Sequence, residues 1–169
     1  SMDFHKFGYA AKGASAVLYS NRDLRRFQIF SHAGWAGYTV INTTVLSTKG
    51  AGSLGACWAI LNYLGEEGYL KIVKDSREAA EKIIKGVGEI EGLYILGKPD
   101  ANLVAMGSNK HSVFRISDVM RKKGWFLQPQ LASDTSPENI HFSVGASNVD
   151  KIDDMLADLR ECINNLDKE

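Results

Sequence analysis

A histidine–lysine pair near the start of the chain is the group of residues best suited to chemistry. His5 and Lys6 lie in a short stretch that also holds Lys12 and contains Gly8 and Gly13. A lysine amine attacks an aldehyde to form a Schiff base only when it is unprotonated, and neighbouring cations or burial favour that form. Both His5 and Lys12 are local sources of such an effect. Composition alone, however, favours a solvated loop lysine.

Further landmarks follow this run in order along the chain. Together with residues 3–15 they resemble the sphingosine-1-phosphate lyases and, more broadly, the group II decarboxylase superfamily of fold type I pyridoxal-phosphate enzymes. The resemblance covers nearly the whole chain. Its residues are Trp-Ala-Gly-Tyr at 35–38, Ser-Thr-Lys-Gly-Ala-Gly at 47–52, Ala-Cys-Trp-Ala at 56–59, Gly-Glu-Glu-Gly-Tyr at 65–69, Asn-Leu-Val-Ala-Met-Gly-Ser at 102–108 and Lys-Gly-Trp at 123–125.

The resemblance implies that the cofactor is pyridoxal 5'-phosphate and that Lys6 holds it as a Schiff base. It places His5 beside the cofactor phosphate, where an imidazole can donate a hydrogen bond. In the phosphate-handling lyases a lysine at the place of Lys12 helps to bind the substrate phosphate. Tyr9 is a further candidate for positioning an anion, and Trp35 for lining the substrate channel. A structural histidine, a surface lysine and packing aromatics are the alternatives.

The segment 47–52 is a second candidate anion site. Glycines and small hydroxyl residues before a helix present backbone N–H groups to an anion. The resemblance implies that Ser47, Thr48 and Gly50 reach the cofactor phosphate of the neighbouring subunit in a homodimer. The more familiar family version reads Arg-Pro-Gly-Gly, whereas Lys49 begins the corresponding stretch here, so the bidentate guanidinium is missing.

Asp3 is not assigned to the pyridinium nitrogen of the cofactor. The resemblance places that aspartate upstream, on a separate strand outside this chain. The remaining histidines, His32, His111 and His141, show no metal-ligand spacing. We expect structural or surface roles for them and no metal site.

The composition excludes several classes of partner. Lysine and arginine total 20 against 20 acidic residues, so nothing indicates a nucleic-acid partner. Cys57 and Cys162 lie far apart in apolar helical patterns, which favours reduced core cysteines of a cytoplasmic protein. No apolar run is long enough to span a bilayer, and no signal peptide is visible.

The hydrophobic periodicity predicts two parts of different character. In the first part we expect a buried strand at 14–19, a short helix or turn at 21–26 and a long ordered loop with extended pieces at 31–52. A helix should begin with Ser53 as its N-cap and break between Gly65 and Gly68. The second part should contain helices at 69–86 and 113–123, strands at 90–96, 103–106, 125–131 and 140–144, and a last helix after a capping box from Ser147 to Asp150.

These elements predict an α/β chain of the fold type I, aspartate aminotransferase-like class. Residues 1–66 are expected to be the C-terminal end of the large cofactor domain, because one strand and one helix cannot bury a core. Residues 67–169 are expected to form the small α+β domain, with helices on one face of a mostly antiparallel sheet. We therefore expect the chain to be part of a longer protein.

Two classes of function remain open from the sequence. The first is a pyridoxal-phosphate carbon–carbon lyase that acts on an amine or phosphorylated amine and releases an aldehyde. An amino-acid decarboxylase of the tyrosine, glutamate or aspartate type is the alternative. An aminotransferase is less favoured, because the strand 140–144 offers no arginine for a substrate carboxylate. The second class is a folded fragment without activity of its own.

Overall fold

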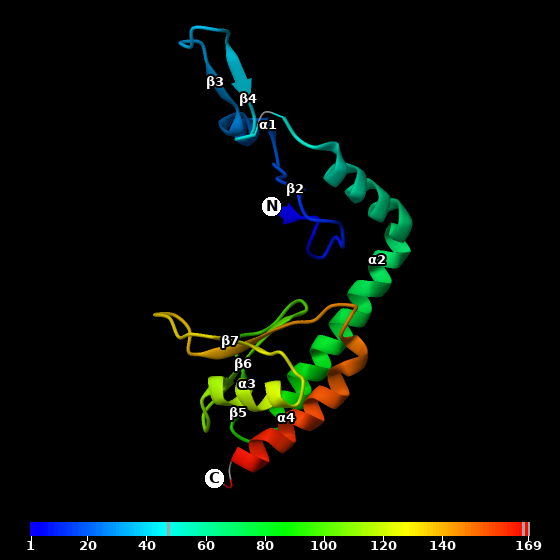
Figure 1. Ribbon diagram of the computed structural model, residues 1–169, viewed down its shortest axis with the longest axis vertical. Helices are drawn as coiled ribbons and strands as arrows, with labels where there is room; N and C mark the ends of the chain where they lie inside the picture. The colour runs from blue at the N-terminus through cyan, green and yellow to red at the C-terminus, as the bar shows by residue number, and fades with distance from the viewer. Residues whose placement is uncertain (47, 167, 169) are drawn as a thin grey trace. The chain divides into compact units, whose positions relative to one another are not determined.

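The computed structural model describes residues 1–46, 48–166 and 168. The chain divides into two compact units, Ser1–Glu66 and Glu67–Glu169. Each is considered by itself below, and Figure 1 labels the helices and strands.

Two small antiparallel ladders make up most of the regular structure before the long helix. Strand β1 (Met2–Asp3) pairs with β2 (Ser15–Ala16), and β3 (Phe30–His32) pairs with β4 (Val40–Asn42). Between them lie a one-turn helix, α1 (Arg22–Arg25), and a 3₁₀ turn. The N-cap of α1 is Asn21, whose Oδ1 accepts the Leu24 N–H at 2.9 Å.

The buried strand predicted at 14–19 is wrong. Strand β2 is two residues long, and the Leu18 side chain that follows it is 78% exposed. A two-stranded ribbon has no second layer to cover its apolar side chains, so it cannot bury them. Within Ser1–Glu66 the described residues supply no such layer.

Helix α2 (Ala51–Gly88) is the longest element and runs through both units. It begins two residues before Ser53, so Ser53 lies in its first turn and the predicted N-cap is wrong. The predicted break falls at Gly65, which has non-helical dihedral angles of φ 58° and ψ −172°. Only glycine adopts such a left-handed conformation without steric cost. Gly68, by contrast, is helical.

The second unit contains a four-stranded sheet that is antiparallel throughout. The strand order is β5-β6-β8-β7. The 3₁₀ turn η2 precedes the last helix, and the bounds are β5 (Leu93–Ile95), β6 (Leu103–Ser108), α3 (Val113–Lys122), β7 (Gln128–Gln130), β8 (Asn139–Ser143), η2 (Val149–Lys151) and α4 (Ile152–Leu166).

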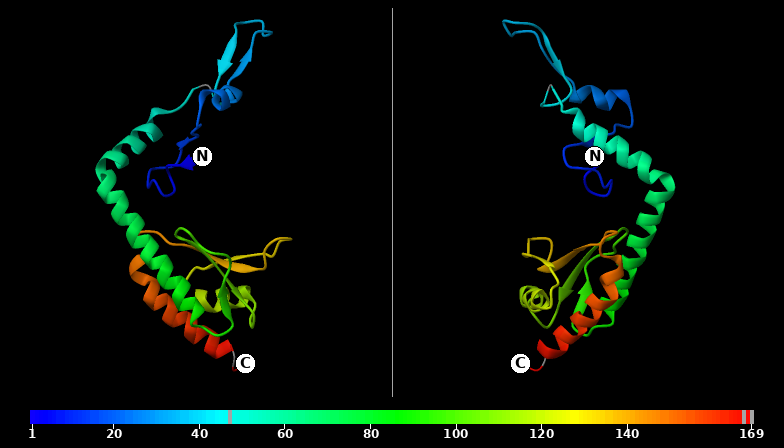
Figure 2. Two further views of the ribbon diagram at one scale, coloured as in Figure 1. Left: turned by 180° about the vertical axis from the view of Figure 1, so that it is seen from behind. Right: turned by 45° about the vertical axis from the view of Figure 1, so that its right-hand side comes forward.

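Three helical segments cover one face of this sheet. The register pairs Val104 with Phe142 and Met106 with Ile140, and all four side chains are buried. Residues in register with two-residue spacing share one face of a sheet. They pack against α3, α4 and the last part of α2 in one core cluster, and Figure 2 shows the last part of α2 beside α4. The mixed helix-and-sheet fold predicted for these residues is confirmed.

The start of the last helix differs in detail from the prediction. Asn148, rather than Ser147, is the N-cap residue of η2, and its side chain makes no cap hydrogen bond. The Asn148 Oδ1 instead accepts the Gly145 N–H at 2.9 Å. A short polar side chain can satisfy either a helix end or a neighbouring turn, and here it folds the preceding turn.

The described residues form neither a membrane-spanning helix nor a metal-binding cluster. None of the helices within 1–46, 48–166 and 168 is both long and apolar enough to cross a bilayer. The same residues contain no group of three His, Cys, Asp or Glu side chains placed to hold a metal ion.

Candidate functional site

The candidate site is built on the connection between β1 and β2, residues 4–14, which we call the lysine loop. Backbone hydrogen bonds close it at two levels: Phe4 N–H donates to Ala14 O at 3.3 Å, and Ala10 N–H donates to Phe4 O at 2.9 Å. A further turn forms where Tyr9 N–H donates to Lys6 O at 3.0 Å. The loop is therefore a compact turn that holds Lys6 between two strands.

Two backbone positions in the lysine loop are sterically demanding. A Cβ added at Gly8 would lie 2.6 Å from the Phe4 carbonyl oxygen, so only glycine fits there. Tyr9 adopts a left-handed φ of 56°, which is uncommon for a non-glycine residue. Strained backbone of this kind clusters at functional sites. Tyr9, whose ring is predicted to position an anion, thus has an uncommon backbone conformation within this closed loop.

Lys6 lies in an ion pair with Asp3. Its Nζ is 2.9 Å from Asp3 Oδ2, and the side chains are 66% and 34% exposed, respectively. The Lys6 hydrogen bond is the largest influence that holds the pKa of the Asp3 carboxyl below its usual value. Asp3 is therefore the immediate partner of the proposed cofactor lysine, a contact that the sequence analysis did not assign.

His5 provides a polar atom without a partner inside the same loop. Its Nδ1 is buried and makes no hydrogen bond among the described residues. Buried polar atoms nearly always have a partner, because leaving one unpaired costs free energy. A ligand oxygen at this position would satisfy the imidazole. The two neighbouring residues of the loop, a lysine and a histidine with an unpaired nitrogen, thus fit an aldehyde that carries a phosphate.

The far end of the lysine loop lies against the first turn of α2. A Cβ added at Gly13 would be 3.2 Å from Ser53 Cβ, so residues 12–13 approach the segment predicted to bind the cofactor phosphate. The first N–H groups of a helix lack intrahelical partners and attract anions. Thr48 and Gly50 are exposed just before this turn, whereas Ser47 lies outside the described residues.

Lys12 and Lys49 differ in their surroundings. Lys12 is exposed. The Lys49 Nζ donates to Thr44 Oγ1 at 2.6 Å and to the Leu46 carbonyl at 3.2 Å. The Lys49 ammonium therefore hydrogen-bonds to its own segment. The arginine of the familiar family version could instead donate two hydrogen bonds to a phosphate.

Trp35 lies in the connection between β3 and β4. Its ring meets Tyr38 edge to face, with centroids 4.7 Å apart. Both rings are exposed. The assignment of Trp35 to a substrate channel stays a prediction.

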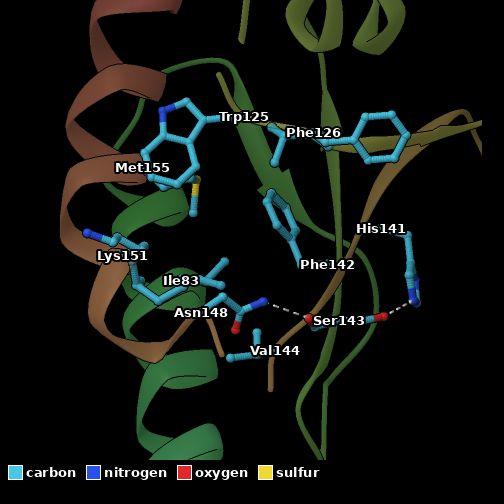
Figure 3. Close-up of a pocket in the computed structure, with 12 residues that line it drawn as sticks. Ile83, Trp125, Phe126, His141, Phe142, Ser143, Val144, Asn148, Lys151 and Met155 are labelled. Atoms are coloured by element: carbon cyan, nitrogen blue, oxygen red, sulfur yellow. Dashed lines mark hydrogen bonds between the residues drawn. The ribbon is translucent and has the colours of Figure 1, made fainter. Parts of the chain in front are cut away.

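The second unit holds a hollow that the sequence analysis missed. Its volume is about 220 Å³, and Figure 3 shows its lining. The floor consists of core side chains from α2, β8 and α4, and half-buried Trp125, exposed Phe126 and exposed Lys151 belong to its wall. In the sequence, Trp125 only began the predicted strand 125–131, so its pattern carried no signal of a surface hollow.

The polar groups of this hollow mainly satisfy one another. Asn148 Nδ2 donates to the Ser143 carbonyl at 3.2 Å, and the Ser143 hydroxyl lies 3.2 Å from His141 Nε2. The Trp125 Nε1–H donates to Asp158 Oδ2 at 2.7 Å. None of the residues predicted for the cofactor or substrate lines it. The lysine loop therefore remains the better candidate for chemistry.

Comparisons with known proteins give a consistent picture, although no family model matches the chain. A sphingosine-1-phosphate lyase of Arabidopsis thaliana is 37% identical over 163 residues, which is 96% of this chain. A solved structure of a Burkholderia pseudomallei sphingosine-1-phosphate lyase matches 96% of the chain with a TM-score of 0.85 and 30% identity. An Oryza sativa TDC solved with PLP and tryptamine shares the fold over 66% of the chain, with a TM-score of 0.58 and 9% identity.

These likenesses confirm the expected α/β fold class. The chain spans 29% of the Arabidopsis protein and 36% of the Burkholderia chain. The matches thus concern about a third of each relative, and the activity of the whole protein has to be argued from the site.

Proposed function

Because this chain is a sphingosine-1-phosphate lyase-like member of the group II pyridoxal-phosphate decarboxylase superfamily, we propose that the intact protein is a carbon–carbon lyase acting on an amine. The observation that carries the proposal is the lysine loop, where Lys6 directly follows His5 in the chain and the His5 Nδ1 is buried without a hydrogen-bond partner. Pyridoxal 5'-phosphate, when bound, supplies an aldehyde and an electron sink for breaking a bond next to the substrate nitrogen.

Each residue of the site has a proposed task. Lys6 would hold pyridoxal phosphate through its aldehyde and would release it to the substrate amine. His5 Nδ1 hydrogen-bonds a phosphate oxygen, which gives this buried atom a partner. Lys12 and Tyr9 orient an anionic group of the substrate, and Trp35 lines its path. Ser47, Thr48 and Gly50 contribute N–H groups to the cofactor phosphate.

Other properties of the intact protein belong to the same proposal. The active site is shared across a homodimer, and the enzyme is cytoplasmic. The 169 residues alone are inactive, as a part of the large cofactor domain followed by the small domain. In support of the last point, the described residues of unit 1 bury very few apolar side chains.

A pyridoxal-phosphate amino-acid decarboxylase is the second candidate. The specific observation in its favour is Lys49, which replaces the familiar arginine and is engaged with Thr44 and the Leu46 carbonyl. That change loosens the likeness to a phosphate-specific site. The two candidates differ in whether an aldehyde or carbon dioxide leaves.

Trapping the cofactor on Lys6 tests the shared part of the proposal. The intact protein with pyridoxal phosphate should show the visible absorbance band of a Schiff base, and borohydride should abolish it and leave the label on Lys6. Lys6→Ala should remove both the label and turnover, whereas the exposed control Lys98→Ala should retain them. A wild-type protein without the band, or an active Lys6→Ala variant, would refute the lyase and the decarboxylase alike.

Lys12 separates the two candidates. Lys12→Ala should selectively reduce turnover of a phosphorylated long-chain amine, because the substrate phosphate loses a cation. Turnover of free aromatic or acidic amino acids should be unaffected. Equal turnover of the phosphorylated amine by wild type and Lys12→Ala would remove Lys12 from the site.

A further inference from the structure

The Asp3–Lys6 contact is fixed by the local backbone. Strand β1 holds Asp3 opposite Ser15 of β2. Lys6 stands one turn further on, where its N–H donates to the Asp3 carbonyl at 3.2 Å. The side chains then meet at 2.9 Å between Lys6 Nζ and Asp3 Oδ2. Both ends of the ion pair are therefore positioned by the same closed turn.

The Asp3–Lys6 contact affects the reactivity of the Lys6 amine more than it affects the stability of the fold. With Lys6 66% exposed and Asp3 34% exposed, the pair contributes little to stability. It does, however, engage the atom that has to react. While Nζ is paired with the Asp3 carboxylate, it is not available to attack an aldehyde.

The charges around Asp3 are consistent with a standing ion pair. Lys6, His5 and, as the chain stands, the α-amino group of Ser1 face the carboxylate, and they lower its pKa together. A carboxyl with a lowered pKa is ionised at neutral pH. The carboxylate partner is thus present there, and it is lost as the pH falls through the pKa of Asp3.

We infer that Asp3 is a positioning residue for the cofactor lysine: its carboxylate holds the Lys6 ammonium whenever that amine is not bonded to pyridoxal phosphate. The inference rests on the proposed function. Loading then requires that the pair opens and that the ammonium loses a proton to solvent. The free amine forms the C=N bond with the aldehyde, and one water molecule leaves. When a substrate amine displaces Lys6, the carboxylate receives the lysine again.

The rate of cofactor loading measures this role directly. The cofactor-free intact protein is mixed with pyridoxal phosphate, and the Schiff-base band is followed across a pH series. Asp3→Asn should load about two- to five-fold faster at neutral pH, because no ion pair has to open. The difference between Asp3→Asn and wild type should disappear in the acid range, where the Asp3 carboxyl is protonated and the ion pair is already lost. Asp3→Glu should behave like wild type, as should the control Asp23→Asn, whose carboxylate lies in α1.

The outcomes separate the inference from the proposed function. An unchanged loading rate in Asp3→Asn at every pH, with a normal band in wild type, overturns the inference alone. Slower loading in Asp3→Asn, with loss of the far-ultraviolet circular dichroism of the folded protein, assigns Asp3 a merely structural role and also overturns it. A wild-type protein that forms no borohydride-sensitive band at Lys6 overturns both.

Discussion

The two compact units of the chain bury their apolar side chains to very different extents. In Glu67–Glu169, β6, β8 and three helical segments share one continuous core, in which Leu159 and Ile116 are fully buried. In Ser1–Glu66, Cys57 is the buried apolar residue among those described, whereas Leu18 and Phe27 are 78% exposed. The unit that carries the proposed chemistry is thus not the unit that carries the stability.

This difference predicts which substitutions should change stability and which should change cofactor binding. Folding free energy comes largely from removing apolar surface from water. Substitutions in the second unit should therefore change stability, whereas substitutions in the lysine loop should change cofactor chemistry. Three measurements can break or sharpen this contrast.

The largest effect is expected from truncation of a core side chain. Leu159→Ala should lower the free energy of unfolding by about 2–5 kcal/mol, because it leaves a cavity among fully buried neighbours. The matched variant Leu18→Ala should change stability by less than about 0.5 kcal/mol, because its side chain already contacts water. Denaturant unfolding of the chain measures both. Equal losses would mean that the first unit is packed as tightly as the second.

A smaller effect is expected from two glycines of the same helix. Replacing either Gly86 or Gly55 of α2 by alanine raises the helix propensity of that position by about 1 kcal/mol. A Cβ at Gly86 would lie 2.5 Å from Leu156 Cδ1, whereas a Cβ at Gly55 meets nothing within 4 Å. Overpacking costs about 1–3 kcal/mol, so Gly86→Ala should destabilise by about 0–2 kcal/mol and Gly55→Ala should stabilise its helix. Amide hydrogen exchange along α2 reports both changes, and protection gained equally at both sites would contradict the packing argument.

The smallest effect is expected from a polar link between α3 and α4. Lys123 Nζ lies 2.8 Å from both Asp158 and Glu161, and Trp125 Nε1 donates to Asp158. The Lys123 and Trp125 hydrogen bonds hold the pKa of Asp158 below its ordinary 3.8. The hydrogen bond to Asp158, and after it the hydrogen bond to Glu161, raises the pKa of Lys123 above its ordinary value.

The sign of the pH dependence follows from these directions. The Asp158 contribution is present above its unfolded pKa and is lost as the pH falls through the lower folded value. The Lys123 contribution is present below its unfolded pKa and is lost as the pH rises through the higher folded value. Wild type should thus be more stable than Asp158→Asn at neutral pH, with the difference shrinking below pH 3.8. A difference independent of pH between neutrality and acid would show that the link is not electrostatic.

The second unit was predictable because its patterns are periodic. Buried positions such as Ile152, Met155 and Leu159 recur at helical spacing, and the expected helices and strands are present with shifted ends. The secondary-structure prediction was wrong where the same type of side chain can be either buried or exposed. The apolar run 14–19 suggested a buried strand, but burial depends on a covering layer that the run itself does not encode. The helix caps were also misplaced, because Ser53 lies inside the first turn of α2 and Asn148 stands at the cap position predicted for Ser147.

The site was predictable only in part. The family resemblance implied cofactor chemistry for His5, Lys6 and Lys12, and their assigned roles stay predictions. The ion pair of Lys6 with Asp3 and the approach of Gly13 to Ser53 were not predicted. Both depend on how the lysine loop closes, and a closing turn joins residues according to dihedral angles rather than residue type.

The sequence by itself determined the residue chemistry of the protein: an amine, an imidazole and a second amine in one glycine-bounded turn, followed by amphipathic helices and strands. Those properties are local, since they follow from side-chain type and from periods of two and 3.6 residues. Only the tertiary structure decided which side chains are covered, that His5 Nδ1 is left without a partner, and that Asp3 receives the Lys6 ammonium. Burial and pairing depend on segments brought together in space, because water is excluded and charges are matched only where surfaces meet.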